Sequence, residues 1–295
     1  MSRPLRIAIL AHSTNPRGGV VHALELGDAL IRLGHEAVVH APDLRGAGFF
    51  RPSLCATVSV PASPVGADIT EMVRIRAGDY IRHFEQPANR RFDVFHAQDG
   101  ISGNALATLK QRGLIPRFAR TVHHVDAFRD PELLALQRRA IVEADRHFVV
   151  SRLWQDLLAE MFALEATIVG NGVDTARFSP VADGREAALK ARLGLGEGPI
   201  VLSVGGVEER KNTTRILEAF VQLRALHPKA QLVIAGGASV LDHHLYQEAF
   251  AATLAASGLP ADAVIRTGAV PQDDMPGLYR LADVLAFASV KEGFG

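Results

Sequence analysis

Glycine and basic residues stand where two predicted strands of the 295-residue chain end. Gly18 and Gly19 follow the first strand and begin a helix, so the backbone can approach a ligand and the helix start offers free N–H groups. Arg210 and Lys211 follow a strand of the second half. Such a pair can bind phosphate oxygens, the arginine as a fork and the lysine as a point charge. An ordinary tight turn and a solvated loop pair are the alternative interpretations.

Histidines end two other predicted strands. His123 closes one of them with His124 directly after it, and His96 closes another, with Asp99 shortly beyond. Ligands bind at the carboxyl ends of parallel strands, so one of these side chains can reach a substrate. With 12 histidines in the chain, a structural or exposed role is the alternative for any one of them. A hydrogen-bonding network within the loop explains His96 and Asp99 equally well.

Cysteine content and apolar segments indicate the compartment. The single cysteine, Cys55, cannot form a disulfide within the chain, so we expect a reducing, cytoplasmic environment. We interpret Cys55 as a structural or surface thiol and not as a nucleophile. No apolar stretch approaches the roughly 20 residues that span a bilayer, which predicts a soluble protein or a peripheral membrane protein without a transmembrane segment.

Short apolar runs alternate with helical patterns along the chain, which predicts an α/β fold of parallel sheets with crossover helices. In the first half, strands are predicted at 6–11, 37–40, 57–60, 92–96, 120–123, 147–150 and 167–169. Helices are predicted at 19–33 and after the caps Asp130 and Ser151. In the second half, strands are predicted at 200–204, 231–235, 264–267 and 284–288, and helices at 213–226, 241–256 and 275–281.

The alternation breaks after Asn171 and restarts at Ile200, following a polar helix and a glycine-rich stretch. We therefore divide the chain into domains 1–179 and 180–295. Each half has the pattern of a doubly wound domain. Two such domains in one chain favour an enzyme that binds its substrates in a cleft.

Several other ligand classes lack their sequence signatures. Gly18 and Gly19 do not complete a dinucleotide fingerprint after the first strand, and a P-loop is absent. An Asp-x-Asp pair and a cluster with metal-ligand spacing are absent as well. Since 32 basic residues balance 32 acidic ones, nucleic acid is not expected as the main partner. We predict no bound metal.

The motifs follow one another in a fixed order: Gly18-Gly19, Asn171-Gly172-Val173-Asp174, Arg210-Lys211-Asn212, Gly268-Ala269-Val270 and Glu292-Gly293-Phe294-Gly295. This ordered set resembles glycosyltransferase family 4 over nearly the whole chain. The resemblance implies a GT-B fold, in which two doubly wound, Rossmann-like domains face a cleft. The first domain is then on the acceptor side and the second holds a nucleotide-sugar donor.

The resemblance also implies roles for individual residues. The loop of Gly18 and Gly19 is expected near the donor phosphates and the acceptor, and His123, or alternatively His124, near the reacting sugar. His96 and Asp99 are expected to line the acceptor side. Arg210 and Lys211 are expected to stabilise the leaving diphosphate. Many family members carry an arginine at the position of Gly206, and we expect Arg210 to take its place.

Glu292 begins the paired-glutamate motif of the resembled family, whose second glutamate lies eight positions later, beyond residue 295. Around the donor sugar, the resemblance places Glu292 with the backbone of Gly293, Phe294 and Gly295. It places Gly268 and Val270 near the base. The second domain is therefore expected to be incomplete, and residues 1–295 alone are expected to be poorly active.

The resemblance predicts a retaining, metal-independent glycosyltransferase that uses a nucleoside-diphosphate sugar and no further cofactor. Its acceptor is a sugar, a lipid or another small molecule. One alternative is another enzyme on the same scaffold, such as a sugar-nucleotide epimerase or a phosphorylase. The other is a nucleotide-sugar binding module without catalytic activity.

Overall fold

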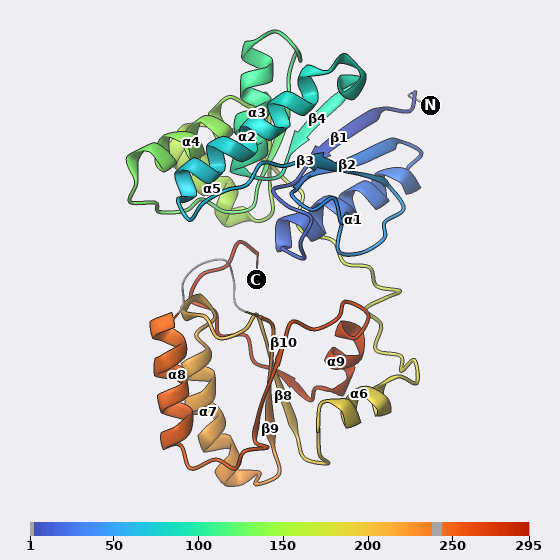
Figure 1. Cartoon of the computed structure of the whole chain (residues 1–295). Coiled ribbons are helices and arrows are strands. Elements are labelled where there is room, and N and C mark those ends of the chain that lie inside the picture. The colour runs from blue at the N-terminus through green and yellow to red at the C-terminus, as the bar shows by residue number, and fades with distance from the viewer. Residues whose placement is uncertain (1–2, 238–243, 295) are drawn as a thin grey trace. The chain divides into compact units, whose positions relative to one another are not determined.

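The chain forms two compact units, shown as a computed structural model in Figure 1, which describes residues 3–237 and 244–294. The N-terminal unit comprises Met1–Val173 together with Gly293–Gly295, and the C-terminal unit comprises Asp174–Glu292. Both units are α/β and have parallel sheets, as the alternation of the sequence predicts.

The N-terminal unit contains a seven-stranded parallel sheet in the order β3-β2-β1-β4-β5-β6-β7. Its strands are β1 (Arg6–Leu10), β2 (Glu36–Asp43), β3 (Ala56–Pro61), β4 (Val94–Ala97), β5 (Ala119–Val122), β6 (Arg146–Val149) and β7 (Thr167–Ile168). All seven coincide with predicted strands, with small differences at their ends. The strand order reverses between β1 and β4, which is the switch point of a doubly wound sheet.

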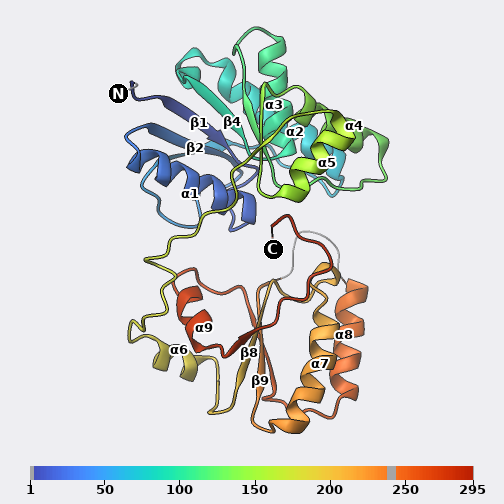
Figure 2. The same cartoon turned by 180° about the vertical axis from the view of Figure 1, so that it is seen from behind.

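Helices cover both faces of this sheet (Figures 1 and 2). They are α1 (Gly18–Arg32), α2 (Ile69–Glu85), η1 (Pro87–Arg90), α3 (Gly100–Gln111), α4 (Pro131–Val142) and α5 (Arg152–Phe162). Ile9 packs with Leu24 of α1 on one face, whereas Leu10 packs with Tyr80 of α2 and Leu106 of α3 on the other. Successive strand residues thus contribute to two separate cores, as expected for a sheet buried on both faces.

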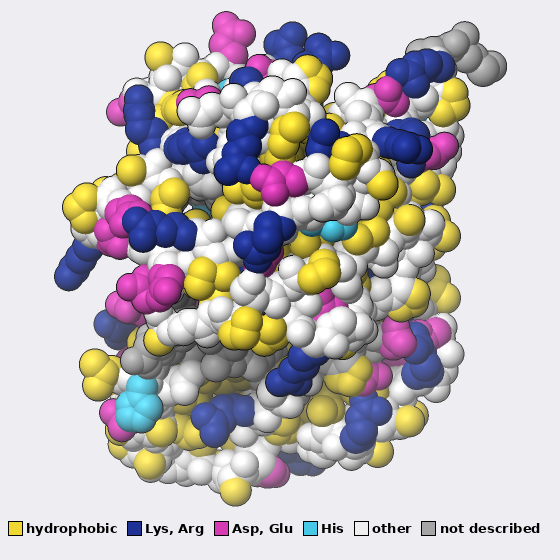
Figure 3. All heavy atoms as spheres, turned by 45° about the horizontal axis from the view of Figure 1, so that its top comes forward, with side chains coloured by type: hydrophobic (Ala, Val, Ile, Leu, Met, Phe, Trp, Pro, Cys, Tyr) yellow, Lys and Arg dark blue, Asp and Glu magenta, His cyan; other side chains and the backbone are white. Residues whose placement is uncertain are grey.

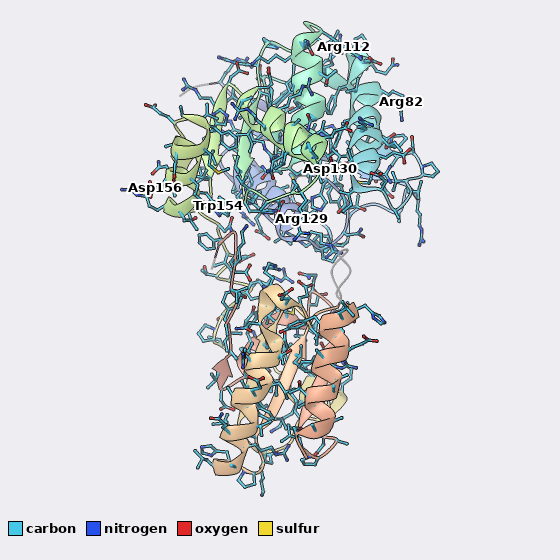
Figure 4. All side chains as sticks on the ribbon, turned by 90° about the vertical axis from the view of Figure 1, so that its left-hand side faces the viewer. Arg82, Arg112, Arg129, Asp130, Trp154 and Asp156 are labelled. Atoms are coloured by element: carbon cyan, nitrogen blue, oxygen red, sulfur yellow. The ribbon has the colours of Figure 1, made fainter. Side chains whose placement is uncertain are left out.

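Helix starts follow the local sequence. The Asp130 carboxylate accepts a hydrogen bond from the Glu132 N–H at 2.8 Å. This confirms Asp130, which Figure 4 labels, as the predicted cap of α4. Ser151 occupies the N-cap position of α5, but its side chain makes no cap hydrogen bond. Trp154 of α5 is buried in an apolar cluster, as a packing residue would be (Figure 4).

The C-terminal unit contains a four-stranded parallel sheet in the order β10-β9-β8-β11. Its elements are α6 (Glu186–Arg192), β8 (Ile200–Val204), η2 (Glu209–Lys211), α7 (Thr213–Leu226), β9 (Gln231–Ala235), α8 (His244–Ala256), β10 (Val264–Gly268), α9 (Met275–Leu281) and β11 (Val284–Leu285). Figure 1 shows α7 and α8 on one face and α6 and α9 on the other. Two apolar clusters, one under each pair of helices, form the cores.

The division between the units falls after Val173 and not after residue 179. The intervening residues already pack on the C-terminal unit. Arg177 donates a hydrogen bond to the Gln272 carbonyl at 2.5 Å, and the Phe178 ring lies 6.1 Å from that of Tyr279. This segment looks like a linker in the sequence because its partners lie far along the chain. β11 is also shorter than predicted, and residues 241–243 of the predicted helix lie outside the described residues.

Charged side chains of both signs are interspersed on the surface, of which Figure 3 shows one face. Many form ion pairs within the described part of the chain, for example Arg3 with Asp93 at 2.5 Å. Among the described residues, no helix combines the length and the apolar character that a membrane crossing requires.

The helices α3 and α4 approach each other closely at Gly103. A Cβ atom at this position would lie 2.8 Å from the Ala140 Cβ and 2.9 Å from the Ala140 carbonyl oxygen. We therefore expect Gly103→Ala to lower the free energy of unfolding by about 1–3 kcal/mol, because the two backbones must separate. Urea denaturation measures this change. Gly100→Ala on the same helix is the matched control, since its Cβ would meet nothing within 4 Å, and an equal effect of both substitutions would contradict the prediction.

Candidate functional site

The switch point of the N-terminal sheet brings two loops together. The segment after β1 leads to Gly18 and Gly19 at the start of α1, and the segment after β4 carries Gln98. The N-terminus of α1 has no side-chain cap, so its first N–H groups are not satisfied by a capping side chain. This is the arrangement that suits an anionic or polar ligand near the two glycines.

His123 lies beside this helix start. A Cβ at Gly19 would be 4.0 Å from the His123 ring carbon Cδ2. The His123 Nε2 atom lies 3.0 Å from the Gln98 Oε1. The rings of His22 and His123 pack edge to face, with their centroids 4.8 Å apart. The His22 Nδ1 atom in turn lies 3.0 Å from the Asn171 Oδ1. The structure thus brings Gly19 and His123 together and adds Gln98 and His22.

His22 was not predicted from the sequence. Its position offered a signal, because it lies one helical turn after Gly18 and Gly19 and so shares their face of α1. Asn171 belongs to a motif that was recognised, but its contact with His22 joins residues far apart in the chain.

The other polar candidates of this unit have different surroundings. His96 is buried and its Nε2 lies 2.7 Å from the Thr121 hydroxyl, within the sheet. His124 is exposed and its Nε2 lies 3.2 Å from the Asp126 carboxylate. The Asp99 carboxylate caps α3 by accepting from the Ser102 N–H at 2.8 Å. The geometry separates His123 from His124, and it gives His96 and Asp99 structural partners.

Burial keeps two imidazoles of this group neutral. Desolvation, with the charges of neighbouring groups, lowers the pKa of His123 to about 2 and that of His96 to about 3. In the tautomer with the proton on Nε2, His123 donates to the Gln98 oxygen and Nδ1 is left as an acceptor. His123 can therefore orient a hydroxyl group without bringing a charge.

The switch point of the C-terminal sheet, between β8 and β11, holds the charged cluster of that unit. The Lys211 Nζ donates to the Glu292 Oε1 at 2.8 Å, and the Arg210 Nη1 donates to the Glu292 Oε2 at 2.6 Å. Burial raises the pKa of Glu292, but the hydrogen bond from Lys211 and the charges of both cations outweigh it, so this pKa lies below its usual value. One carboxylate therefore bridges two cations.

Glycines shape the loop that carries these cations. Gly205 has a φ of +124°, and a Cβ there would lie 2.4 Å from the Lys211 Cε, so the lysine stem crosses this glycine. The Phe287 ring lies 5.0 Å from the Lys211 Nζ. Gly206 has a φ of +78°, and a Cβ there would lie 2.7 Å from the Gly237 carbonyl oxygen. This backbone does not accommodate an arginine at position 206.

The remaining predicted donor residues are distributed differently. The Gly268 carbonyl accepts a hydrogen bond from the Gly236 N–H at 2.9 Å, which places the end of β10 beside the glycine-rich loop. Val270 packs its side chain against an apolar core cluster. Gly293 and Phe294 are grouped with the N-terminal unit, and Gly295 lies outside the described residues. Glu292 is thus the part of its motif that meets Arg210 and Lys211.

A metal-ligand cluster is not found among residues 3–237 and 244–294, where no three His, Cys, Asp or Glu side chains are placed to hold an ion. Cys55 is buried, and burial raises the pKa of its thiol. These observations fit a structural thiol.

Sequence models of two glycosyltransferase families match the chain in succession. The model of Glycosyltransferase Family 4 matches residues 16–177, and the model of Glycosyl transferases group 1 matches residues 185–295. The chain belongs to glycosyltransferase family 4. The ordered motifs therefore identified the family correctly.

Several curated relatives of this family 4 chain have names that refer to inositol-containing molecules. The D-inositol 3-phosphate glycosyltransferase of Salinispora arenicola is 30% identical in an alignment of 228 residues, which covers 69% of this chain and 50% of that protein. The GDP-mannose-dependent alpha-(1-6)-phosphatidylinositol monomannoside mannosyltransferase of Mycobacterium tuberculosis is 28% identical over 98% of this chain and 74% of its own length. The family 4 chain spans 40–50% of the first three relatives that it matches.

Solved structures show the same fold. The sucrose-phosphate synthase of Thermosynechococcus elongatus has a TM-score of 0.78 at 20% identity, covering 99% of the family 4 chain and 77% of the synthase. The HepE protein of Anabaena, solved with UDP-glucose, has a TM-score of 0.73 at 16% identity, covering 99% and 76%. The predicted GT-B fold is confirmed.

The buried imidazoles make stability depend on pH. The folded pKa of His96, about 3, lies below the unfolded value near 6.5, so only the unfolded chain gains this proton as the pH falls. The contribution of neutral His96 to the free energy of unfolding is therefore present in full above about pH 6.5 and decreases as the pH falls below that value. We expect His96→Asn to reduce the loss of unfolding free energy between pH 7.5 and pH 5.5 by about 1.4 kcal/mol, measured by urea denaturation. The difference between the two proteins in unfolding free energy at pH 7.5 measures the effect of the substitution on packing alone, because His96 is neutral there in both states. An equal pH dependence in both proteins would contradict the prediction.

Proposed function

We propose that this chain contains the donor and acceptor sites of a retaining, metal-independent glycosyltransferase. In this proposal a sugar moves from a nucleoside-diphosphate carrier to a hydroxyl group of the acceptor. The observation that carries the proposal is the bridging of Arg210 and Lys211 by Glu292 at the switch point of the second sheet. Membership of family 4 supports it.

The two cations suit a departing diphosphate. Negative charge grows on the diphosphate as its bond to the sugar carbon breaks, and fixed cations nearby stabilise that charge. Arg210 can bind two phosphate oxygens at once and Lys211 adds a point charge. Together they supply the positive charge that a divalent metal supplies in other enzymes, so we propose that neither a metal nor any cofactor besides the donor is needed.

Glu292 has two roles in this proposal. Without a donor it holds Arg210 and Lys211 in one place, at 2.6 Å and 2.8 Å. With a donor bound, the cations turn to the diphosphate, and the freed carboxylate can accept hydrogen bonds from sugar hydroxyls. The acceptor hydroxyl attacks the sugar carbon on the face that the diphosphate leaves and gives its proton to the departing diphosphate oxygen. The new bond forms on the side where the old one breaks, so the sugar carbon retains its configuration.

The N-terminal unit supplies the acceptor side. Gly18 and Gly19 present backbone N–H groups, and neutral His123 orients a hydroxyl group of either substrate. The names of the relatives support this class of reaction, because they include a GDP-mannose-dependent mannosyltransferase and an inositol-phosphate glycosyltransferase. A structural neighbour was solved with UDP-glucose. We propose a cytoplasmic enzyme, with sugar, lipid and small-molecule acceptors as candidates.

Substitution of Lys211 tests the proposed role of the two cations directly. We expect Lys211→Ala in the full-length protein to lower kcat/KM by roughly thirtyfold to a thousandfold, because about 2–4 kcal/mol of transition-state stabilisation is lost. Steady-state kinetics with UDP-, GDP- and ADP-sugars measure it.

Arg215→Ala is the matched control, since Arg215 is an exposed cation that pairs with Glu218 on α7. Near-normal turnover of Lys211→Ala would refute the role of Lys211. If the unaltered protein bound a nucleotide sugar but transferred none across the donor panel, the binding-module alternative would replace the enzyme.

A further inference from the structure

The threonine that begins α7 closes the loop that carries the two cations. Thr213 is fully buried, and its hydroxyl donates a hydrogen bond to the Gly206 carbonyl oxygen at 2.9 Å. This bond joins the two ends of the segment between β8 and α7, and that segment contains Arg210 and Lys211. One side chain of α7 therefore fixes the distance across the loop.

The helix end of this bond is firmly packed. Leu217 and Phe220, one and two turns further along α7, are buried in an apolar core of the C-terminal unit. The Thr214 N–H donates to the Tyr246 hydroxyl of α8 at 2.9 Å, which ties the start of α7 to a second helix. The helix is thus a fixed point from which the Thr213 hydroxyl reaches the loop.

The glycine end of the bond lies beneath the Lys211 side chain. The lysine stem crosses Gly205, so its course depends on where the backbone of Gly205 and Gly206 lies. Both glycines have positive φ angles, and a glycine backbone has much conformational freedom unless contacts restrict it. The Gly205 N–H donates to the Ala235 carbonyl at 2.7 Å, and the Gly206 carbonyl accepts from Thr213. Removal of the hydroxyl takes away one of these restraints.

We infer that Thr213 is a positioning residue for Lys211 in the proposed transfer. In that reaction the lysine leaves Glu292 for the diphosphate, so the carboxylate no longer fixes the lysine when the sugar bond breaks. The hydrogen bond of Thr213 does not involve a ligand, because this residue is fully buried, and it holds the backbone beneath the lysine in both states. The identity of the ligand rests on the proposed function, whereas the closure of the loop rests on the hydrogen bond alone.

Two neighbouring threonines allow a matched test in the full-length protein. Thr213→Val replaces the hydroxyl by a methyl group of similar size and leaves the buried Gly206 carbonyl without this donor. Thr214→Val makes the same change one residue later, where the hydroxyl is buried and has no hydrogen-bond partner among the described residues. Thr213→Ser keeps the hydroxyl. Thr213→Ala removes it without adding a methyl group and serves if the valine variant folds poorly.

Steady-state kinetics distinguish a positioning role from a purely structural one. We expect Thr213→Val to lower kcat about tenfold and to change the donor KM less than about threefold, because a displaced Lys211 weakens chiefly the transition state, in which charge grows on the diphosphate. Thr213→Ser is expected to recover most of the loss, and Thr214→Val to match the unaltered protein. Equal effects of the two valine substitutions, or no recovery with serine, would refute the inference.

Two measurements without sugar transfer separate this inference from the proposed function. Calorimetric titration with UDP and with GDP is expected to show a Kd about tenfold higher in Thr213→Val, and unchanged in Thr214→Val, for whichever nucleotide binds. The Lys211 N–H, which donates to the Glu208 carbonyl at 3.0 Å, is expected to exchange its hydrogen about tenfold faster only in Thr213→Val.

The outcomes are distinct. Weaker nucleotide binding and faster exchange in Thr213→Val, in a protein that transfers no sugar from any donor, would refute the proposed function and support the positioning role. Sugar transfer that Thr213→Val leaves intact would support the proposed function and refute the positioning role. Unchanged exchange at the Lys211 N–H refutes the positioning role even if neither nucleotide binds.

Discussion

Parallel pairing is the constraint on which the rest of this structure depends. Parallel strands need long crossover connections, and these bring every carboxyl end to one edge of the sheet. Where the strand order reverses, between β1 and β4 and between β8 and β11, the crossovers leave in opposite directions and the loops there are not covered by a common helix. Gln98 follows β4 at the first reversal, and Lys211 and Glu292 follow β8 and β11 at the second. The chain therefore needs few polar side chains to build its sites.

Backbone geometry and charge are linked in the second site. The unusual φ angles of Gly205 and Gly206 fold the loop tightly against Gly236 and Gly237, which removes room for a side chain at position 206. The positive charge that many relatives are expected to carry there appears a few residues later, on Arg210. Its guanidinium still reaches the same carboxylate as Lys211, because η2 turns both side chains toward Glu292. The loop thus changes its sequence while keeping two cations at one carboxylate.

The sequence predicted the strands and most helices because their apolar residues are continuous or evenly spaced. The helices α2 and α3 were missed for opposite reasons. In α2 a charged residue faces inward, since buried Asp79 accepts hydrogen bonds from the Ser63 N–H at 3.0 Å and from Arg76 at 2.9 Å. In α3 every residue from Ile101 to Ala107 is buried, so no polar face marks its period. The meeting of Lys211 with Glu292 depends on strand order, which a single sequence does not display.

The bridging of two cations by Glu292 has a consequence for selectivity. A carboxylate that already contacts both Arg210 and Lys211 acts as an internal competitor, so a small anion must displace it to bind either cation closely. A ligand with one negative oxygen can replace only one of the two contacts and leaves the other cation attached to Glu292. A ligand that brings two or more charged oxygens replaces both and releases the carboxylate. The resting site thereby discriminates by the number of charges a ligand carries before any sugar is recognised.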